Sequence, residues 1–106
     1  MELNPLKIKN NEGLKKSLTV IAKSLNLSLT DYSVRCRSRK YVYLRMIGEL
    51  YMRQNHPQVR LAEMAHFFGY EDHSTVVNLH ASALDKLKNK KEFQEKYNIA
   101  MMAIKK

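Results

Sequence analysis

The chain has 106 residues, 44% of them hydrophobic, so one domain of ordinary size with its own core is the expected organisation. It carries 19 Lys and Arg against 10 Asp and Glu, and this formal net charge of +9 favours polyanionic partners. Cys36 is the single cysteine, which excludes an intramolecular disulfide framework; the apolar runs are too short for a signal peptide or a membrane span, so we expect a cytoplasmic protein without membrane contact.

Helix-forming residues dominate the sequence, with only three glycines and two prolines, which predicts an all-α fold of five to six helices. Residues 1–12 show little periodicity and are expected to form an N-terminal arm, followed by one helical domain over residues 13–106. The first helix should extend from about Gly13 to Asn26, because apolar residues recur there at helical spacing. A brief helix or turn should follow over 27–34, with Thr30-Asp31 as its capping pair.

A long helix is expected from about Ser38 to Gln54, with one apolar face. Another of its faces alternates in charge through Arg45, Glu49 and Arg53 at spacings of four residues. Proline at position 57 ends this helix, because a residue that precedes proline avoids the helical conformation. The next apolar pattern predicts a two-turn helix over 61–68 that stops at Gly69, a residue that readily adopts the left-handed conformation.

A further helix should begin with Asp72 or Ser74 as its N-cap. The residues expected to face inward on it are Val76, His80, Ala83, Leu84 and Leu87. On its outer face we expect short and mostly polar side chains, from Ser74, Thr75, Asn78, Ala81, Ser82 and Asp85. After a polar break at Asn89, the residues that predict a last helix are Phe93, Tyr97, Ala100, Met101 and Ile104.

Two amphipathic helices joined by a glycine turn, over about residues 60–88, have the outline of a helix-turn-helix. Ala65 would allow the helices to cross closely, and Gly69 would permit the turn. Short polar side chains let a helix enter the DNA major groove, while the basic run from Arg35 to Arg45 would contact phosphates. An ordinary hairpin of two helices with a solvated outer face gives the same pattern, so both interpretations stay open.

The segments L-A-E-M-A at 61–65 and F-G-Y-E-D-H-S-T-V-V at 68–77 carry a resemblance to a known family. They resemble the DNA-binding C-terminal domain of the bacterial chromosomal replication initiator DnaA, which typically reads L-P-x-I-G-x-x-F-G-G-R-D-H-T-T-V. Weaker similarity extends the match to roughly residues 13–90. The resemblance implies sequence-specific binding of double-stranded DNA, with a role in the initiation or regulation of replication. The sequence has no G-x-x-x-x-G-K-[ST] motif, so we expect neither a nucleotide cofactor nor ATPase activity.

The resemblance also implies which residues contact DNA. The residues expected to meet base edges are Asp72, His73 and Ser74, with Asn78 assisting from the same outer face. Those expected to contact phosphate or to enter the minor groove are Thr75, Arg35, Arg37, Arg39 and Lys40, with Arg37 or Arg39 as the minor-groove arginine.

Glu71 stands where the family has an arginine, and this charge reversal disfavours contact with phosphate. It supports an alternative function, a module that keeps the fold, binds protein or RNA, and has lost sequence-specific duplex recognition. Ser74 replaces the family's threonine and lacks a methyl group that would pack on thymine. Metal binding and catalysis are not expected, because the four histidines lack zinc-ligand spacing and Cys36 has no neighbouring base. We expect His80 to have a packed structural role, because its angle around the helix places it with Val76 and Ala83.

Overall fold

The computed structural model describes residues 12–34 and 38–105, and these residues contain helices but no strand. The elements are α1 (Glu12–Ser24), the 3-10 helix η1 (Leu29–Ser33), α2 (Arg39–Asn55), α3 (Leu61–Phe68), α4 (His73–Asn89) and α5 (Lys91–Lys105). The predicted all-α fold is therefore confirmed, as a compact globule of five α-helices and one 3-10 turn in this part of the chain. The arm expected over residues 1–12 lies outside the described residues, except that Glu12 begins α1.

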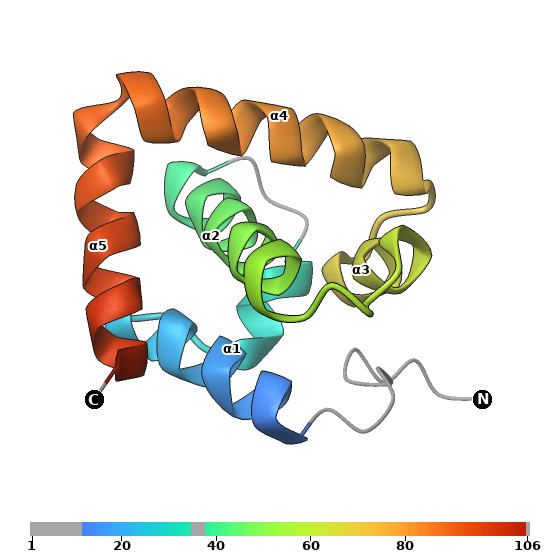
Figure 1. The fold of residues 1–106 in the computed structure, drawn as a ribbon, viewed down its shortest axis with the longest axis horizontal. Coiled ribbons are helices and arrows are strands. Elements are labelled where there is room, and N and C mark those ends of the chain that lie inside the picture. The colour runs from blue at the N-terminus through green and yellow to red at the C-terminus, as the bar shows by residue number, and fades with distance from the viewer. Residues whose placement is uncertain (1–11, 35–37, 106) are drawn as a thin grey trace.

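Helix α2 lies at the centre of the molecule (Figure 1), with α4 across one side of it, α1 on the opposite side and α5 along the edge that joins them. Ten consecutive residues of α2, from Tyr43 to Met52, are buried, so this helix is covered all round. The alternating charges predicted for one face are present, but α4 packs on Glu49, and Val34 and Tyr70 pack on Arg45, so both charged residues are buried. Helix α2 thus carries charged groups into the core, where they require partners.

The segment between α1 and α2 places one aromatic ring in the core. Ser28 caps η1, with its backbone N–H donating to Asp31 Oδ2 at 2.8 Å. The predicted capping pair Thr30-Asp31 is correct in part: Asp31 caps the helix as the third residue of a capping box, but the N-cap is Ser28, and both predicted residues lie within the 3-10 helix. The short helix directs Tyr32 inward, where its hydroxyl donates to Leu18 O at 2.7 Å and its ring centroid lies 5.1 Å from that of Phe67.

Gly48 of α2 leaves the space that the Tyr32 ring occupies. A Cβ atom at position 48 would lie 2.7 Å from Cε1 of Tyr32, and this buried ring is held by its hydrogen bond to Leu18. We expect Gly48→Ala to lower the free energy of unfolding by about 1–2 kcal/mol, because overpacking outweighs the gain of roughly 1 kcal/mol in helix propensity. Urea denaturation measures this difference. Gly13→Ala is the matched control, since a Cβ there meets no described atom within 4 Å, and equal stability of the two variants would contradict the prediction.

The connection between α3 and α4 follows the predicted pattern. Gly69 has a φ of +78°, and its N–H and that of Tyr70 donate to His66 O at 3.1 Å and Ala65 O at 2.8 Å. This pair of bonds is the Schellman arrangement, which satisfies the carbonyls at the helix end. Asp72 then caps α4, accepting from the Ser74 N–H at 3.0 Å. The turn therefore fixes the start of α4 against α3.

The inward face of α4 differs from the prediction at two positions, Leu79 and Leu84. Leu84, expected to face inward, has 47% of its surface exposed, whereas Leu79 is only 8% exposed. The buried residues Val76, Leu79 and Ala83 lie at spacings of three and four, and position 84 lies about 100° beyond Ala83 around the helix. The packed face is thus rotated away from Leu84, and the last helix has its predicted face, with Phe93 and Ala100 buried.

Candidate nucleic-acid interface

The four residues expected to read bases all lie at the start of α4 and are exposed to solvent. Asp72 is the N-cap, His73 and Ser74 follow in the first turn, and Asn78 lies one turn later. The first turn of a helix presents backbone N–H groups that lack partners within the helix, and Asp72 satisfies that of Ser74. The structure therefore gathers these residues at one exposed end of a helix whose opposite face is packed on the core.

Asp72 is held as a negatively charged acceptor at this end. The hydrogen bond from the Ser74 backbone N–H is the main cause that lowers the pKa of the Asp72 carboxyl below its ordinary value, and the nearby His73 lowers it further. The Nδ1 atom of His73 lies 3.8 Å from Asp72 Oδ1. An ionised carboxylate accepts hydrogen bonds and cannot donate them, so this position suits an amino group as its partner.

Of the residues expected to contact phosphate or the minor groove, Thr75 is exposed in the first turn of α4, whereas Arg39 and Lys40 form a separate group. Arg35 and Arg37 lie outside the described residues, while Arg39 and Lys40 open α2 and are exposed. Arg39 Nη1 forms an ion pair with Glu92 Oε1 of α5 at 2.9 Å, and Lys40 Nζ lies 5.0 Å from the centroid of the Tyr41 ring. Both residues are thus near the far end of α4 rather than beside Asp72.

Spacing along α4 connects the two groups. Thr75, Asn78, Ser82 and Lys86 follow one another at intervals of three, four and four residues, so they share one flank of the helix. The first three are exposed and Lys86 is half-buried. Lys86 lines a cleft with Arg39, and thirteen residues of helix separate it from His73, a rise on the order of 20 Å. A continuous polar flank therefore leads from the start of α4 to the start of α2.

A second cleft, of about 230 Å³, adjoins the start of α4 on the side of α3. It is lined by Ala62, Ala65, His66, Tyr70, Glu71, Asp72 and His73. Glu71 and Asp72 are both exposed here, so this side of the helix start carries two adjacent carboxylates. Across residues 12–34 and 38–105, no group of three or more His, Cys, Asp or Glu side chains is placed to hold a metal ion.

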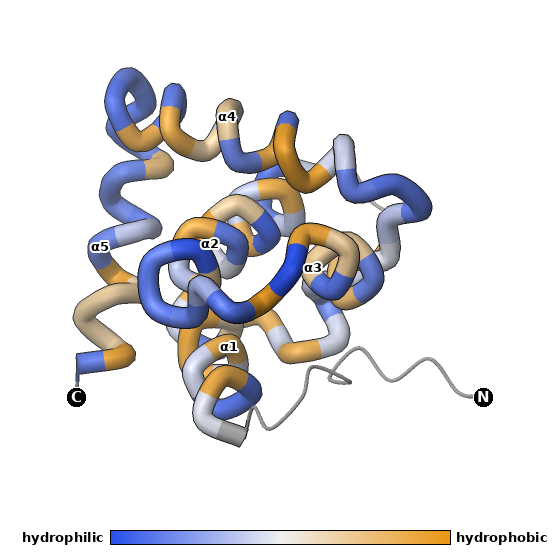
Figure 2. Tube along the Cα trace, turned by 45° about the vertical axis from the view of Figure 1, so that its right-hand side comes forward, coloured by the Kyte–Doolittle hydropathy of each residue, from blue (hydrophilic) through white to orange (hydrophobic). Residues whose placement is uncertain are grey.

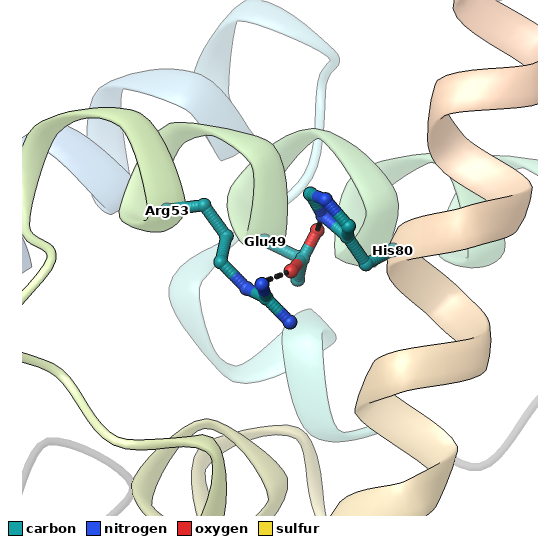
Figure 3. A network of polar contacts seen from close by, with 3 residues as sticks. All are labelled: Glu49, Arg53 and His80. Carbon is teal, nitrogen blue, oxygen red and sulfur yellow. Dashed lines mark hydrogen bonds and ion pairs between the residues drawn. The ribbon is translucent and has the colours of Figure 1, made fainter.

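A buried polar network holds α4 on α2 (Figure 3). Glu49 of α2 is fully buried, and its Oε1 lies 2.9 Å from Nδ1 of His80, which projects from α4. Its Oε2 lies 2.8 Å from Nε of Arg53, one turn further along α2. Burial is the main cause that raises the pKa of the Glu49 carboxyl, and His80 and Arg53 counteract part of this effect. His80 therefore packs against α2 as expected, with 26% of its side chain still exposed.

Arg45, one turn before Glu49 on α2, contacts two segments that lie near the start of α4. Its Nη1 donates to Val34 O at 2.8 Å, and its guanidinium carbon lies 5.8 Å from the centroid of the Tyr70 ring in the turn before α4. Sequence analysis recognised the charges of α2 but not this function, because four-residue spacing looks the same on a buried face and on a solvated one. Arg45 and Glu49 together fix both the turn and the helix that follow Gly69.

Comparison with protein-family models finds no match to this chain, and comparison with solved structures finds none either. Within the described residues, none of the helices has the length and apolar character needed to cross a membrane. What the fold and the site define is thus a small all-α globule that presents an exposed, polar helix start and a separate basic cleft.

Proposed function

We propose that this protein binds double-stranded DNA in a sequence-specific manner, with α3 and α4 acting as a helix-turn-helix and the start of α4 entering the major groove. The observation that carries the proposal is the exposed row of short polar side chains at one end of a helix fixed by α2 and α3. Such side chains allow close approach of a helix to base edges, and rigid support holds them in register. No nucleotide or metal takes part in this function.

Each base-reading residue has a chemical role that the structure is compatible with. The Asp72 carboxylate would accept from the cytosine amino group, Asn78 would pair with adenine, and the Ser74 hydroxyl would donate or accept. His73 extends from the first turn with its ring exposed. Val77, which sequence analysis passed over, is 45% exposed beside Asn78 and offers methyl groups to thymine.

Phosphate contacts would come from the polar flank and from the basic residues near α2. Thr75 lies in the first turn of α4, and Arg39 and Lys40 open α2. Arg35 and Arg37 belong to the same basic run, and Arg37 or Arg39 would enter the minor groove, as the resemblance to the DnaA domain implies. The formal net charge of +9 provides the long-range attraction that brings the duplex to this surface.

Glu71 favours the alternative function, a module that binds protein or RNA. Its exposed carboxylate lies next to Asp72, and two negative charges at the start of α4 would repel the phosphates that flank the groove. Under this alternative the chain would bind duplex DNA only through its overall charge. Such binding would select no sequence and would disappear as salt rises.

Selection of duplexes from a randomised pool at near-physiological salt tests the proposal. We expect an enriched motif, and we expect Asp72→Asn or Ser74→Ala to cost about 1–3 kcal/mol on that motif without weakening binding to random duplex. Asparagine is as good an N-cap as aspartate, so Asp72→Asn changes the acceptor without removing the cap. Lys40→Ala should instead weaken binding to all sequences alike, as measured by fluorescence anisotropy.

Absence of an enriched motif would reject the proposed sequence-specific binding and favour the protein- or RNA-binding alternative. Equal losses on all duplexes from Asp72→Asn, Ser74→Ala and Lys40→Ala would reject the assignment of base contacts. Circular dichroism of each variant separates these outcomes from loss of the fold.

A further inference from the structure

A basic cleft of about 450 Å³ lies where the start of α2 meets the corner between α4 and α5. Its lining residues are Arg39, Val42, Tyr43, Lys86, Lys90 and Glu92. Figure 2 shows that the chain around the α4–α5 corner is hydrophilic. Three cations therefore face one carboxylate in this hollow, and the local charge favours an anionic ligand.

The cations of the cleft differ in how they are paired. Arg39 holds Glu92 at 2.9 Å, but both side chains are well exposed, at 69% and 48%, so this ion pair is weak and readily exchanged. Within the described residues, no carboxylate lies within ion-pair distance of Lys86 or Lys90. The cleft thus has two unpaired ammonium groups and one guanidinium whose partner a stronger anion can displace.

Val42 and Tyr43 form the apolar part of the cleft's lining, which is otherwise polar. Tyr43 is 4% exposed, and its ring meets that of Phe93 edge-on with centroids 5.1 Å apart. Lys86 and Lys90 are one turn apart at the end of α4, where the Lys90 N–H donates to Lys86 O at 2.8 Å. Both lysines line the cleft, so their two positive charges lie close enough together to act on one anion.

The polar flank from Thr75 to Lys86 places this cleft on the same surface as the start of α4. The two ends are separated by a rise on the order of 20 Å, which is shorter than one turn of duplex at about 34 Å. A duplex whose major groove receives the start of α4 therefore extends far enough to present a phosphate to the cleft.

We infer that the cleft holds a backbone phosphate of the duplex that α4 reads, through Lys86, Lys90 and Arg39, and that Glu92 competes with this phosphate for Arg39. The inference rests on the proposed binding of duplex DNA and adds a second anchoring point to it. In the free protein Glu92 is paired with Arg39. In the complex with DNA the phosphate replaces Glu92 as the partner of Arg39. Glu92 thereby weakens binding to all sequences equally and lets base contacts decide which duplex stays bound.

Titration of a labelled random duplex over a series of salt concentrations tests the cleft. We expect Lys86→Ala and Lys90→Ala each to flatten the slope of log K against log salt by about 1. Lys88→Ala is the matched control, because Lys88 is an exposed lysine of the same helix that does not line the cleft, and it should leave the slope unchanged. If Lys88→Ala flattened the slope as much as the two cleft variants do, the inference would be overturned. Binding would then depend on the overall positive charge and not on the cleft.

The competition by Glu92 has its own matched pair of variants. Glu92→Gln should raise affinity for random duplex about two- to fivefold over Glu95→Gln, an exposed change of the same charge outside the cleft. In an Arg39→Ala background this advantage should vanish. Equal affinities of the two glutamine variants in the otherwise unchanged protein would overturn the competition.

These outcomes are distinguishable from failure of the proposed function. If a motif is enriched but the cleft variants bind duplex as the unaltered protein does, sequence-specific binding stands and the phosphate site in the cleft is rejected. Cleft effects on random duplex without any enriched motif would keep the phosphate site and reject base reading. Lack of binding to any duplex would overturn both.

Discussion

Tyr32→Ala is expected to lower the free energy of unfolding by about 4 kcal/mol, within the usual range for removing a buried aromatic ring. The ring is fully buried, with centroid distances of 5.1 Å to Phe67 and 6.2 Å to Phe68 of α3. It also fills the space left by Gly48 of α2, and its hydroxyl bonds Leu18 of α1. Its removal leaves a cavity at the meeting point of three helices, which urea denaturation followed by far-ultraviolet circular dichroism will measure.

Tyr32→Phe separates the ring from its hydroxyl. This variant keeps the packing and loses only the hydrogen bond to Leu18 O, so a loss of about 1 kcal/mol is expected. If the alanine variant proved no less stable than the phenylalanine variant, the ring would not be the contact that joins the helices. The comparison also tests the role of η1, since this short helix is what directs Tyr32 inward.

The succession of helices could be predicted from the sequence because each signal is local. Gly69 ends α3, Asp72 caps α4, and both follow from the conformational preferences of single residues. The exposure of the polar residues at the start of α4 could be predicted in the same way, from spacing around one helix. Whether these residues contact DNA stays a prediction.

The burial of α2 could not be predicted, because it depends on which helices surround it. Arg45 and Glu49 have the spacing of a solvated charged face, and only the elements that pack over α2 turn this face inward. The same limit explains Leu84, which continues an apolar pattern yet points away from the core. The packed face of α4 is set by its contacts with α2 and α3, which sequence periodicity does not contain.

The basic cleft likewise combines residues that are far apart in the sequence. Arg39 and Glu92 are separated by 53 positions, and their ion pair forms only because α5 turns back against α2. Sequence analysis identified Arg39 as one member of a basic run but gave no reason to group it with Lys86 and Lys90. The contacts of a basic run depend on which helices fold against it, here the corner between α4 and α5.

Glu49→Ala is the second change with a large expected effect, a loss of about 3 kcal/mol in the free energy of unfolding at neutral pH. The carboxyl group is fully buried and contacts His80 at 2.9 Å and Arg53 at 2.8 Å. Its removal leaves both of these side chains without their carboxylate partner. Breaking a buried pair from one side usually costs about 3–5 kcal/mol. The lower end applies because His80 and Arg53 are partly exposed and can reach water. Glu95→Ala, an exposed control on α5, should change stability by less than about 0.5 kcal/mol.

Glu49→Gln shows how ionisation of this carboxyl affects stability. Burial raises the pKa of Glu49 above its ordinary value of 4.5, so above pH 4.5 the folded protein retains a proton that the unfolded chain has released. The stability contributed by this proton is fully present below that pH and is lost as pH rises through the folded pKa. The stability of the unaltered protein relative to Glu49→Gln should therefore fall with rising pH across this window, measured by urea denaturation at a series of pH values. A relative stability that rises with pH would mean that His80 and Arg53 outweigh burial, and that α4 is held on α2 by a net attraction between charges.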